Sequence, residues 1–135
     1  EAVIKGLPEH VHVEYKGELT PDQVVSTISE YDFFFMPTLG ENFGHVIAEA
    51  LCAGLPLLIA NTTPWRNLQQ EGIGWDLPLN NLNAFSNTID QLALMPVELH
   101  MHMRKTVLAW AKNKFSQQNA IKANIDMFRY AYEKK

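Results

Sequence analysis

Two acidic residues flank a glycine-containing turn near the middle of the chain. Glu41 and Glu49 are eight residues apart, with Gly44 between them. On one helix, that spacing would separate them by about 80° around the axis and about 12 Å along it. The two carboxylates are then too far apart to share a proton or to bind one metal ion. They are instead suited to holding the two ends of an extended ligand that crosses the turn.

The turn itself is suited to binding an anion. Phe43, Gly44 and His45 are expected to form the first turn of a helix, where backbone N–H groups lack intrahelical partners and the helix dipole is positive. Gly44 has no side chain, so an anion can approach the backbone closely. These properties predict a phosphate site. Spacing alone favours a plainer alternative, in which Glu41 caps the helix and Glu49 is a solvated acid or an acid at the edge of the core.

The segments around this turn predict alternating strands and helices. Residues 11–15 alternate apolar and polar side chains and end near Gly17, which is typical of a strand. Residues 32–37 contain three consecutive phenylalanines, so both faces of that strand are expected to be buried, as in a parallel sheet. Further strands are expected at 55–60 and 74–77, and helices from Thr20–Pro21, over 44–53 (ended by Gly54) and near Gln70. Ligands of such sheets bind at the carboxyl ends of the strands.

The second half of the chain is predicted to be helical. The periodicity of its apolar residues predicts an amphipathic helix that ends before Pro96. Two more helices are expected over 97–115 and 120–132, the first with Met101, Leu108 and Phe115 facing inward. The predicted fold class is α/β, a Rossmann-like parallel sheet between helices with a C-terminal helical extension. We expect one partial domain over 1–135, with an α/β core at 1–80 and helices at 81–135.

The composition narrows the classes of function. The chain has 135 residues, of which 47% are hydrophobic and 19% charged, with a net charge of −4. These values are those of a soluble globular protein. The charges are mixed along the chain, which argues against nucleic-acid binding, because that function relies on basic surfaces.

Cysteine and histidine usage points to neither disulfides nor metal. Cys52 is the single cysteine, so we expect it to be a small core residue in a reducing, cytoplasmic compartment. The histidine pairs at 10 and 12 and at 100 and 102 have no third ligand nearby in the sequence, so no metal site is expected. The apolar runs are too short to span a bilayer and we expect no signal peptide. Any membrane association would then be peripheral, at the inner face.

A pattern over residues 37–56 resembles a known family signature. It reads Pro-Thr-x-x-Glu-x-Phe-Gly-x-x-x-x-Glu-Ala-x-x-x-Gly-x-Pro and includes Glu41, Gly44 and Glu49. This pattern is similar to the Glu-x7-Glu motif of glycosyltransferase family 4 (group 1), in the C-terminal donor-binding domain of GT-B glycosyltransferases. The likeness covers nearly the whole chain and extends to Gly17 and to the Gly72-x-Gly74 turn.

The resemblance implies a role for each residue of the motif. Glu41 would be the catalytic-site residue that contacts the donor sugar hydroxyls, and Glu49 would bind the ribose hydroxyls. The backbone of Phe43, Gly44 and His45 would hold the pyrophosphate and the sugar. The implied reaction is retaining transfer of a sugar from a UDP-, GDP- or ADP-sugar, without a metal or another cofactor. Its catalytic work would be stabilisation of the departing diphosphate.

The resemblance also places the base of the donor and suggests what is missing. Leu19 and Thr20, in the turn after Gly17, would lie near the base. The family's first strands of this domain and its acceptor-binding N-terminal domain would precede Glu1, so we expect weak nucleotide binding and no transfer by these 135 residues alone. The 32–37 strand would then expose an edge. Either the 11–15 strand shifts beside it, or two copies pair.

Two other functions stay open at this point. A non-catalytic sugar-nucleotide-binding or assembly module would keep the scaffold without turnover. A GT-B UDP-N-acetylglucosamine epimerase would share the fold, although the motif spacing fits a transferase better. In the loop after the 55–60 strand, Trp65 is either a packing residue or a ring that stacks on a sugar, and Arg66 is either a surface residue or a phosphate or acceptor contact. A similar Pro-Trp-Arg loop in some bacterial enzymes suggests surface-polysaccharide synthesis.

Overall fold

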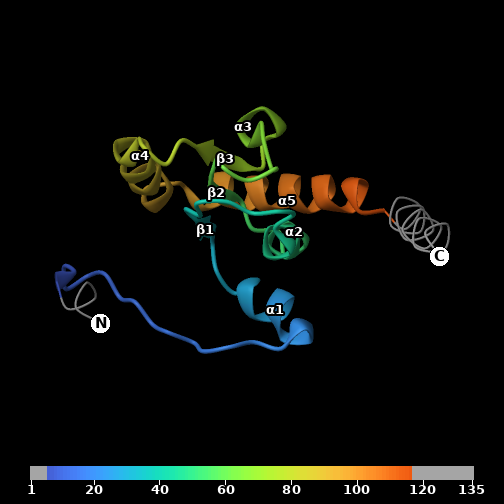
Figure 1. Cartoon of the computed structure of the whole chain (residues 1–135), viewed down its shortest axis with the longest axis horizontal. Helices are drawn as coiled ribbons and strands as arrows, with labels where there is room; N and C mark the ends of the chain where they lie inside the picture. The colour runs from blue at the N-terminus through green and yellow to red at the C-terminus, as the bar shows by residue number, and fades with distance from the viewer. Residues whose placement is uncertain (1–5, 117–135) are drawn as a thin grey trace, which may run out of the picture.

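The computed structural model describes residues 6–116. Helices and strands alternate along most of this part of the chain, and two helices follow one another at its end (Figure 1). Their order is α1 (Pro21–Ile28), β1 (Phe34–Met36), α2 (His45–Cys52), β2 (Leu57–Ala60), α3 (Leu68–Glu71), β3 (Gly74–Leu77), α4 (Leu82–Ala93) and α5 (Val97–Lys114). The helix predicted at 120–132 lies outside the described residues.

Three parallel strands form the sheet, in the order β1-β2-β3. Phe35 of β1 pairs with Leu58 of β2, which in turn pairs with Trp75 of β3. The helices α2 and α3 lie in the two connections, because parallel strands need a crossover between them. All four residues of β2 are apolar and buried, as expected of a strand covered on both faces. The fold is therefore α/β and Rossmann-like, as predicted.

Different helices cover the two faces of the sheet. Side chains alternate along a strand, so Leu57 and Ile59 of β2 face one way and Leu58 and Ala60 face the other. The first pair belongs to the core formed with α2, α3 and α5. The second pair packs with Phe85 of α4. The larger core lies on the α2 face, which also carries the helix of the candidate site.

Two helix ends form as predicted. Thr20 is the N-cap of α1, and its N–H donates to the side chain of Gln23 at 3.2 Å, as in a capping box. A hydrogen bond from Thr20 lowers the pKa of the Asp22 carboxyl in the same turn. Gly54 follows α2 in the left-handed conformation, with a φ of +75°.

Arg104 of α5 connects the ends of two other helices. Its guanidinium donates to the carbonyl of Tyr31 at 2.8 Å and to the carbonyl of Ser29 at 3.1 Å, both just after α1. It also donates to the carbonyl of Ala53, after α2, at 3.2 Å. Carbonyls at helix C-termini lack intrahelical donors and carry partial negative charge, so one cation stabilises both ends.

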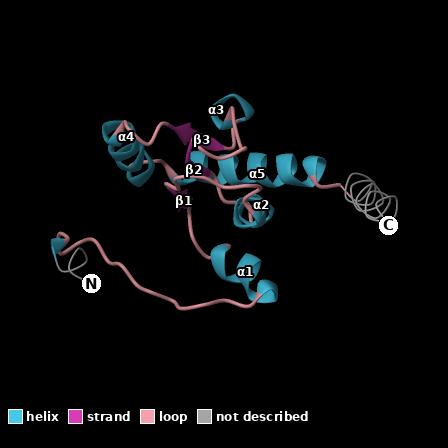
Figure 2. Cartoon of the chain, in the orientation of Figure 1, coloured by secondary structure: helices cyan, strands magenta, loops and turns pink. Residues whose placement is uncertain are grey.

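The strand predicted at residues 11–15 does not form. Figure 2 shows a long loop before α1, and Val11, Val13 and Tyr15 on it are exposed. A strand needs a neighbouring strand for its backbone hydrogen bonds, and the described sheet contains β1, β2 and β3 alone. As a result β1 is an edge strand. Phe35 is 52% exposed, so the prediction that this strand would be covered on both faces is wrong.

The prediction that Cys52 is a core residue is also wrong. Cys52 is exposed at the end of α2. The buried residues of this helix are Ile47, Ala50 and Leu51. Consecutive residues of a helix are about 100° apart, which turns Cys52 away from the core that Leu51 enters.

The inward face of α5 differs from the predicted one. Met101 and Leu108 are about half exposed, whereas Val107 and Ala111 are buried. Val107 and Ala111 are four residues apart and share one helix face, which packs on α2. Phe115, the third residue predicted to face inward, is partly buried against this core.

Candidate functional site

The turn before α2 presents a row of backbone N–H groups. Gly44 is the N-cap of α2, in the left-handed conformation, and the helix begins at His45. The N–H groups of Ile47 and Ala48 donate to the Gly44 carbonyl at 2.9 and 3.3 Å. Within residues 6–116, the N–H groups of Gly44, His45 and Val46 donate to no acceptor. A left-handed residue followed by a helical one turns successive amides into a concave anion-binding surface at the positive end of the helix.

Packing, as well as conformation, explains the glycine at position 44. Gly44 is buried, with a φ of +75°. A Cβ at this position would lie 2.8 Å from Cδ1 of Ile47 and 3.3 Å from Nε1 of Trp65. The side of Gly44 that a side chain would occupy is therefore filled by protein. The sequence analysis expected the missing side chain to make room for an anion. The space that a Cβ would take is instead occupied by Ile47 and Trp65.

The two acidic residues of the motif precede and follow this row of amides along the chain. Glu41 is exposed in the loop between β1 and α2, and Glu49 is half-buried in the second turn of α2. No side chain forms a capping hydrogen bond at the start of α2. Glu41 therefore does not have the capping role of the plainer alternative. Neither carboxylate forms a hydrogen bond or an ion pair with residues 6–116, which leaves both with acceptor oxygens for a ligand.

The other residues predicted to bind the donor make fewer contacts with one another. His45 is exposed, and its ring lies against Phe43 with 4.9 Å between ring centroids. Phe43 also lines a groove of 310 Å³ that includes Trp65, Arg66 and Trp110. Leu19 and Thr20 lie at the start of α1. Among the described residues, no hydrogen bond or ring contact joins either of them to the motif.

The loop after β2 contributes contacts that sequence reasoning missed. The Thr62 hydroxyl donates to the Thr38 carbonyl at 2.6 Å, and the Trp65 indole N–H donates to the Phe43 carbonyl at 2.6 Å. Both contacts join this loop to the loop that carries Glu41. The sequence could have indicated that these two loops meet, because the loops after adjacent parallel strands lie at the same edge of the sheet.

Arg66 is held by the protein. Its guanidinium donates to the Asn61 carbonyl and lies 3.6 Å from the carboxylate of Asp76. That carboxylate also accepts the N–H of Leu68, at the start of α3, at 2.9 Å. Arg66 therefore connects the carboxyl end of β2 to that of β3. About half of its side chain stays exposed at this edge.

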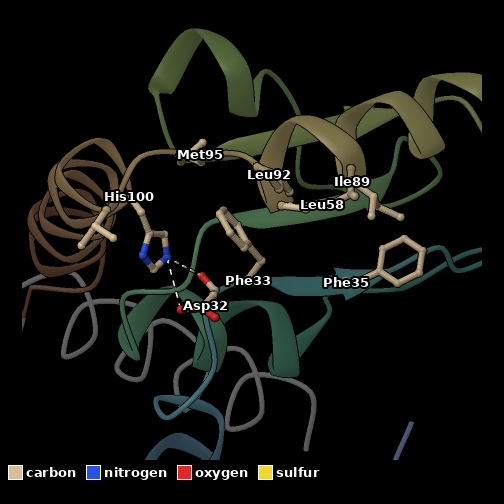
Figure 3. Close-up of a pocket in the computed structure, with 10 residues that line it drawn as sticks. Asp32, Phe33, Phe35, Leu58, Ile89, Leu92, Met95 and His100 are labelled. Carbon is tan, nitrogen blue, oxygen red and sulfur yellow. Dashed lines mark hydrogen bonds and ion pairs between the residues drawn. The ribbon is translucent and has the colours of Figure 1, made fainter. Parts of the chain in front are cut away.

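A second groove lies at the opposite face of the sheet, beside β1 (Figure 3). It has a volume of 430 Å³ and is mostly apolar, with Phe33, Phe35, Leu58 and Ile89 among its lining residues. At one end, His100 Nε2 lies 3.0 Å from the Asp32 carbonyl oxygen. None of the residues predicted to bind a ligand lines this groove, so its size does not identify the candidate site.

Comparison with known proteins assigns the chain to a family. A family model described as Glycosyl transferases group 1 matches residues 2–110. The chain belongs to this family. No curated protein and no solved structure matches it.

The group 1 assignment confirms the resemblance drawn from the sequence and implies sugar transfer from a nucleotide-sugar donor. The matched region contains every described strand and all of the Glu41–Glu49 motif. No helix within residues 6–116 has the length and hydropathy that a bilayer crossing requires. The same residues contain no group of three His, Cys, Asp or Glu side chains placed to bind a metal.

Proposed function

We propose that the start of α2 binds the diphosphate of a nucleotide-sugar donor. The observation that supports this most directly is the row of three amides at Gly44, His45 and Val46, whose donors have no acceptor within residues 6–116. The N–H groups at a helix start lack intrahelical acceptors and lie at the positive end of the helix dipole, so this row is suited to an external anion. Membership of the group 1 family supports the diphosphate of a nucleotide-sugar as this anion.

The two glutamates would bind the two ends of the donor. Carboxylates accept hydrogen bonds from hydroxyls, which both the sugar and the ribose carry. Glu41, in the exposed loop before the turn, would contact the sugar. Glu49, in the second turn of α2, would contact the ribose. Leu19 and Thr20 would lie near the base, which requires the start of α1 to approach the motif.

In the proposed reaction, the bond between the anomeric carbon and the diphosphate oxygen breaks, and the acceptor oxygen bonds to the same face of that carbon. The departing diphosphate takes the electron pair of the broken bond with its negative charge, and the acceptor hydroxyl passes its proton to it. Amides fixed at the start of α2 would stabilise that charge without reorganising during the step. Glu41 would orient the sugar and need not act as a nucleophile.

The finer parts of the proposal rest on the family resemblance. They are retention of the anomeric configuration, an acceptor bound by a separate N-terminal domain, and a cytoplasmic role in bacterial surface-polysaccharide synthesis. The Pro64-Trp65-Arg66 loop supports the last of these. We also propose that the α/β core of the domain lies within residues 1–80 and that helices within 81–135 complete it.

A titration followed by amide NMR tests the proposed site. The 135-residue chain is titrated with UDP, GDP and ADP and with their glucose conjugates. Addition of the preferred nucleotide should shift the amide signals of Gly44, His45 and Val46 first. Glu49→Gln should weaken nucleotide and conjugate alike by about tenfold, whereas Glu41→Gln should weaken the conjugate alone, since each loses a charged hydrogen-bond acceptor.

A matched control makes this result specific. Glu98 is an exposed acid in the first turn of α5, and Glu98→Gln should leave every affinity unchanged. Shifts centred on other residues, or equal effects of all three substitutions, would refute the proposed site.

A further inference from the structure

Trp65 makes a direct contact with the turn that precedes α2. Its indole N–H donates to the Phe43 carbonyl at 2.6 Å, although the two residues are 22 positions apart. The two rings pack edge to face, with 5.9 Å between centroids. The indole nitrogen also lies 3.3 Å from the position that a Cβ of Gly44 would take. One side chain therefore holds both residues of the Phe43–Gly44 peptide.

This contact fixes the direction in which the amides point. The Phe43–Gly44 peptide is trans, as are all those described, so its C=O and N–H point in opposite directions. Because the Phe43 carbonyl faces the Trp65 indole, the Gly44 N–H faces away from it. Rotation of this peptide would turn the Gly44 N–H inward and would break the row that continues with His45 and Val46.

Trp65 is itself held from two sides. The buried Thr63 hydroxyl accepts the Trp65 backbone N–H at 3.2 Å. The indole packs against Trp110 of α5 and against Phe115, with centroid separations of 6.3 and 6.2 Å. An aromatic ring with two restricted torsions and several neighbours is a rigid support. It is partly buried and its N–H is used, so it is poorly placed to stack on a sugar.

We propose that Trp65 is a positioning residue, which holds the amide row of Gly44, His45 and Val46 in its binding conformation. The effect on ligand affinity rests on the proposed function, but the effect on the turn does not. Trp65 acts through the Phe43 carbonyl and touches no part of the ligand. The anchored ring also links the Phe43–Gly44 turn to α5, which begins more than 50 residues further along the chain.

The test compares two tryptophans of the same aromatic cluster. Trp65→Phe keeps a ring and removes the indole N–H. Trp110→Phe makes the same chemical change in the neighbouring ring, whose N–H donates to the Glu71 carboxylate at 2.9 Å. We expect amide hydrogen exchange at Ile47 and Ala48, which donate to the Gly44 carbonyl, to become about tenfold faster in Trp65→Phe alone, as for loss of one hydrogen bond. The affinity for the preferred nucleoside diphosphate should fall by a similar factor in that variant alone.

If a variant does not fold, a measurement on the unsubstituted chain still tests the proposal. The Trp65 indole proton should exchange with solvent more slowly than that of Trp75, whose N–H has no acceptor within residues 6–116. Equal exchange of the two protons, or equal loosening of the turn by both substitutions, would overturn the proposal. Faster exchange in Trp65→Phe, in a chain that binds no nucleotide, would support the positioning role and refute the proposed function instead.

Discussion

Gly44 is constrained both by its backbone and by its neighbours. Its φ of +75° is unfavourable for any residue with a side chain, and a Cβ would meet Ile47 and Trp65. We expect Gly44→Ala to lower the free energy of unfolding by about 1–3 kcal/mol, measured by urea denaturation. Gly40 lies in the same loop, and a Cβ there would have nothing within 4 Å. Gly40→Ala should therefore change the free energy of unfolding by less than about 0.5 kcal/mol. Equal effects of the two substitutions would contradict this account.

The pKa of the Cys52 thiol depends on Glu49, which lies three residues before it on α2. Partial burial of the sulfur, and then the negative charge of Glu49, raise the pKa of the Cys52 thiol above its ordinary value of 9.0. The thiolate is the reactive form, so alkylation should reach half its maximal rate only above pH 9.0. Glu49→Gln removes one cause of the shift, lowers the pKa and should speed alkylation severalfold at pH 8, as followed by mass spectrometry. Glu41→Gln, as the control, should leave the rate unchanged.

Single residues of the motif could be predicted from the sequence, but their surroundings could not. The Gly44 turn and the following helix are local features, set by the residue types themselves. The contact of Trp65 with Phe43 joins residues 22 positions apart, and local patterns contain no information about such a pairing. For this reason Trp65 could be interpreted from the sequence only as one of two alternatives.

Arg104 is the clearest stabilising contact between helices. Its guanidinium donates to three carbonyls at the ends of α1 and α2. Arg104→Met should lower the free energy of unfolding by about 1–3 kcal/mol, because charged donors are lost while an apolar stem remains. The neighbouring Lys105 is exposed, and Lys105→Met should cost less than about 0.5 kcal/mol. Urea denaturation measures both values, and limited proteolysis before α1 should become faster in Arg104→Met alone.

Elements with their own local signals were predicted correctly, and those that depend on a partner were not. Helix α1 has a cap and a proline at its start, and β2 is a continuous apolar run, so each is specified within its own segment. Residues 11–15 have the alternation of a strand, but a strand also needs a neighbour to receive its hydrogen bonds. In α5, the burial of Val107 rather than Leu108 depends on how that helix lies on α2.

At the scale of the whole molecule, β1 leaves an open edge beside an apolar groove. The Phe34 N–H donates to the Pro56 carbonyl at 3.0 Å, so the backbone groups of Phe35 point away from β2. Unpaired apolar edges favour pairing with a second copy of the chain. We expect concentration-dependent dimers in sedimentation velocity, and Phe35→Lys should suppress them. Leu39 is 91% exposed but lies outside the groove, so Leu39→Lys should leave the dimers intact.

The position of Trp65 should make its fluorescence sensitive to a ligand bound at the Gly44 turn. Indole emission depends on nearby charge, and Trp65 lies against the turn at Gly44, whereas Trp75 lies on the α4 side of the sheet. A nucleotide bound at this turn should therefore change the emission intensity, and Trp65→Phe should abolish the change while Trp75→Phe preserves it. Ligand screening would then need no label, because the residue that shapes the turn also reports when the turn is filled.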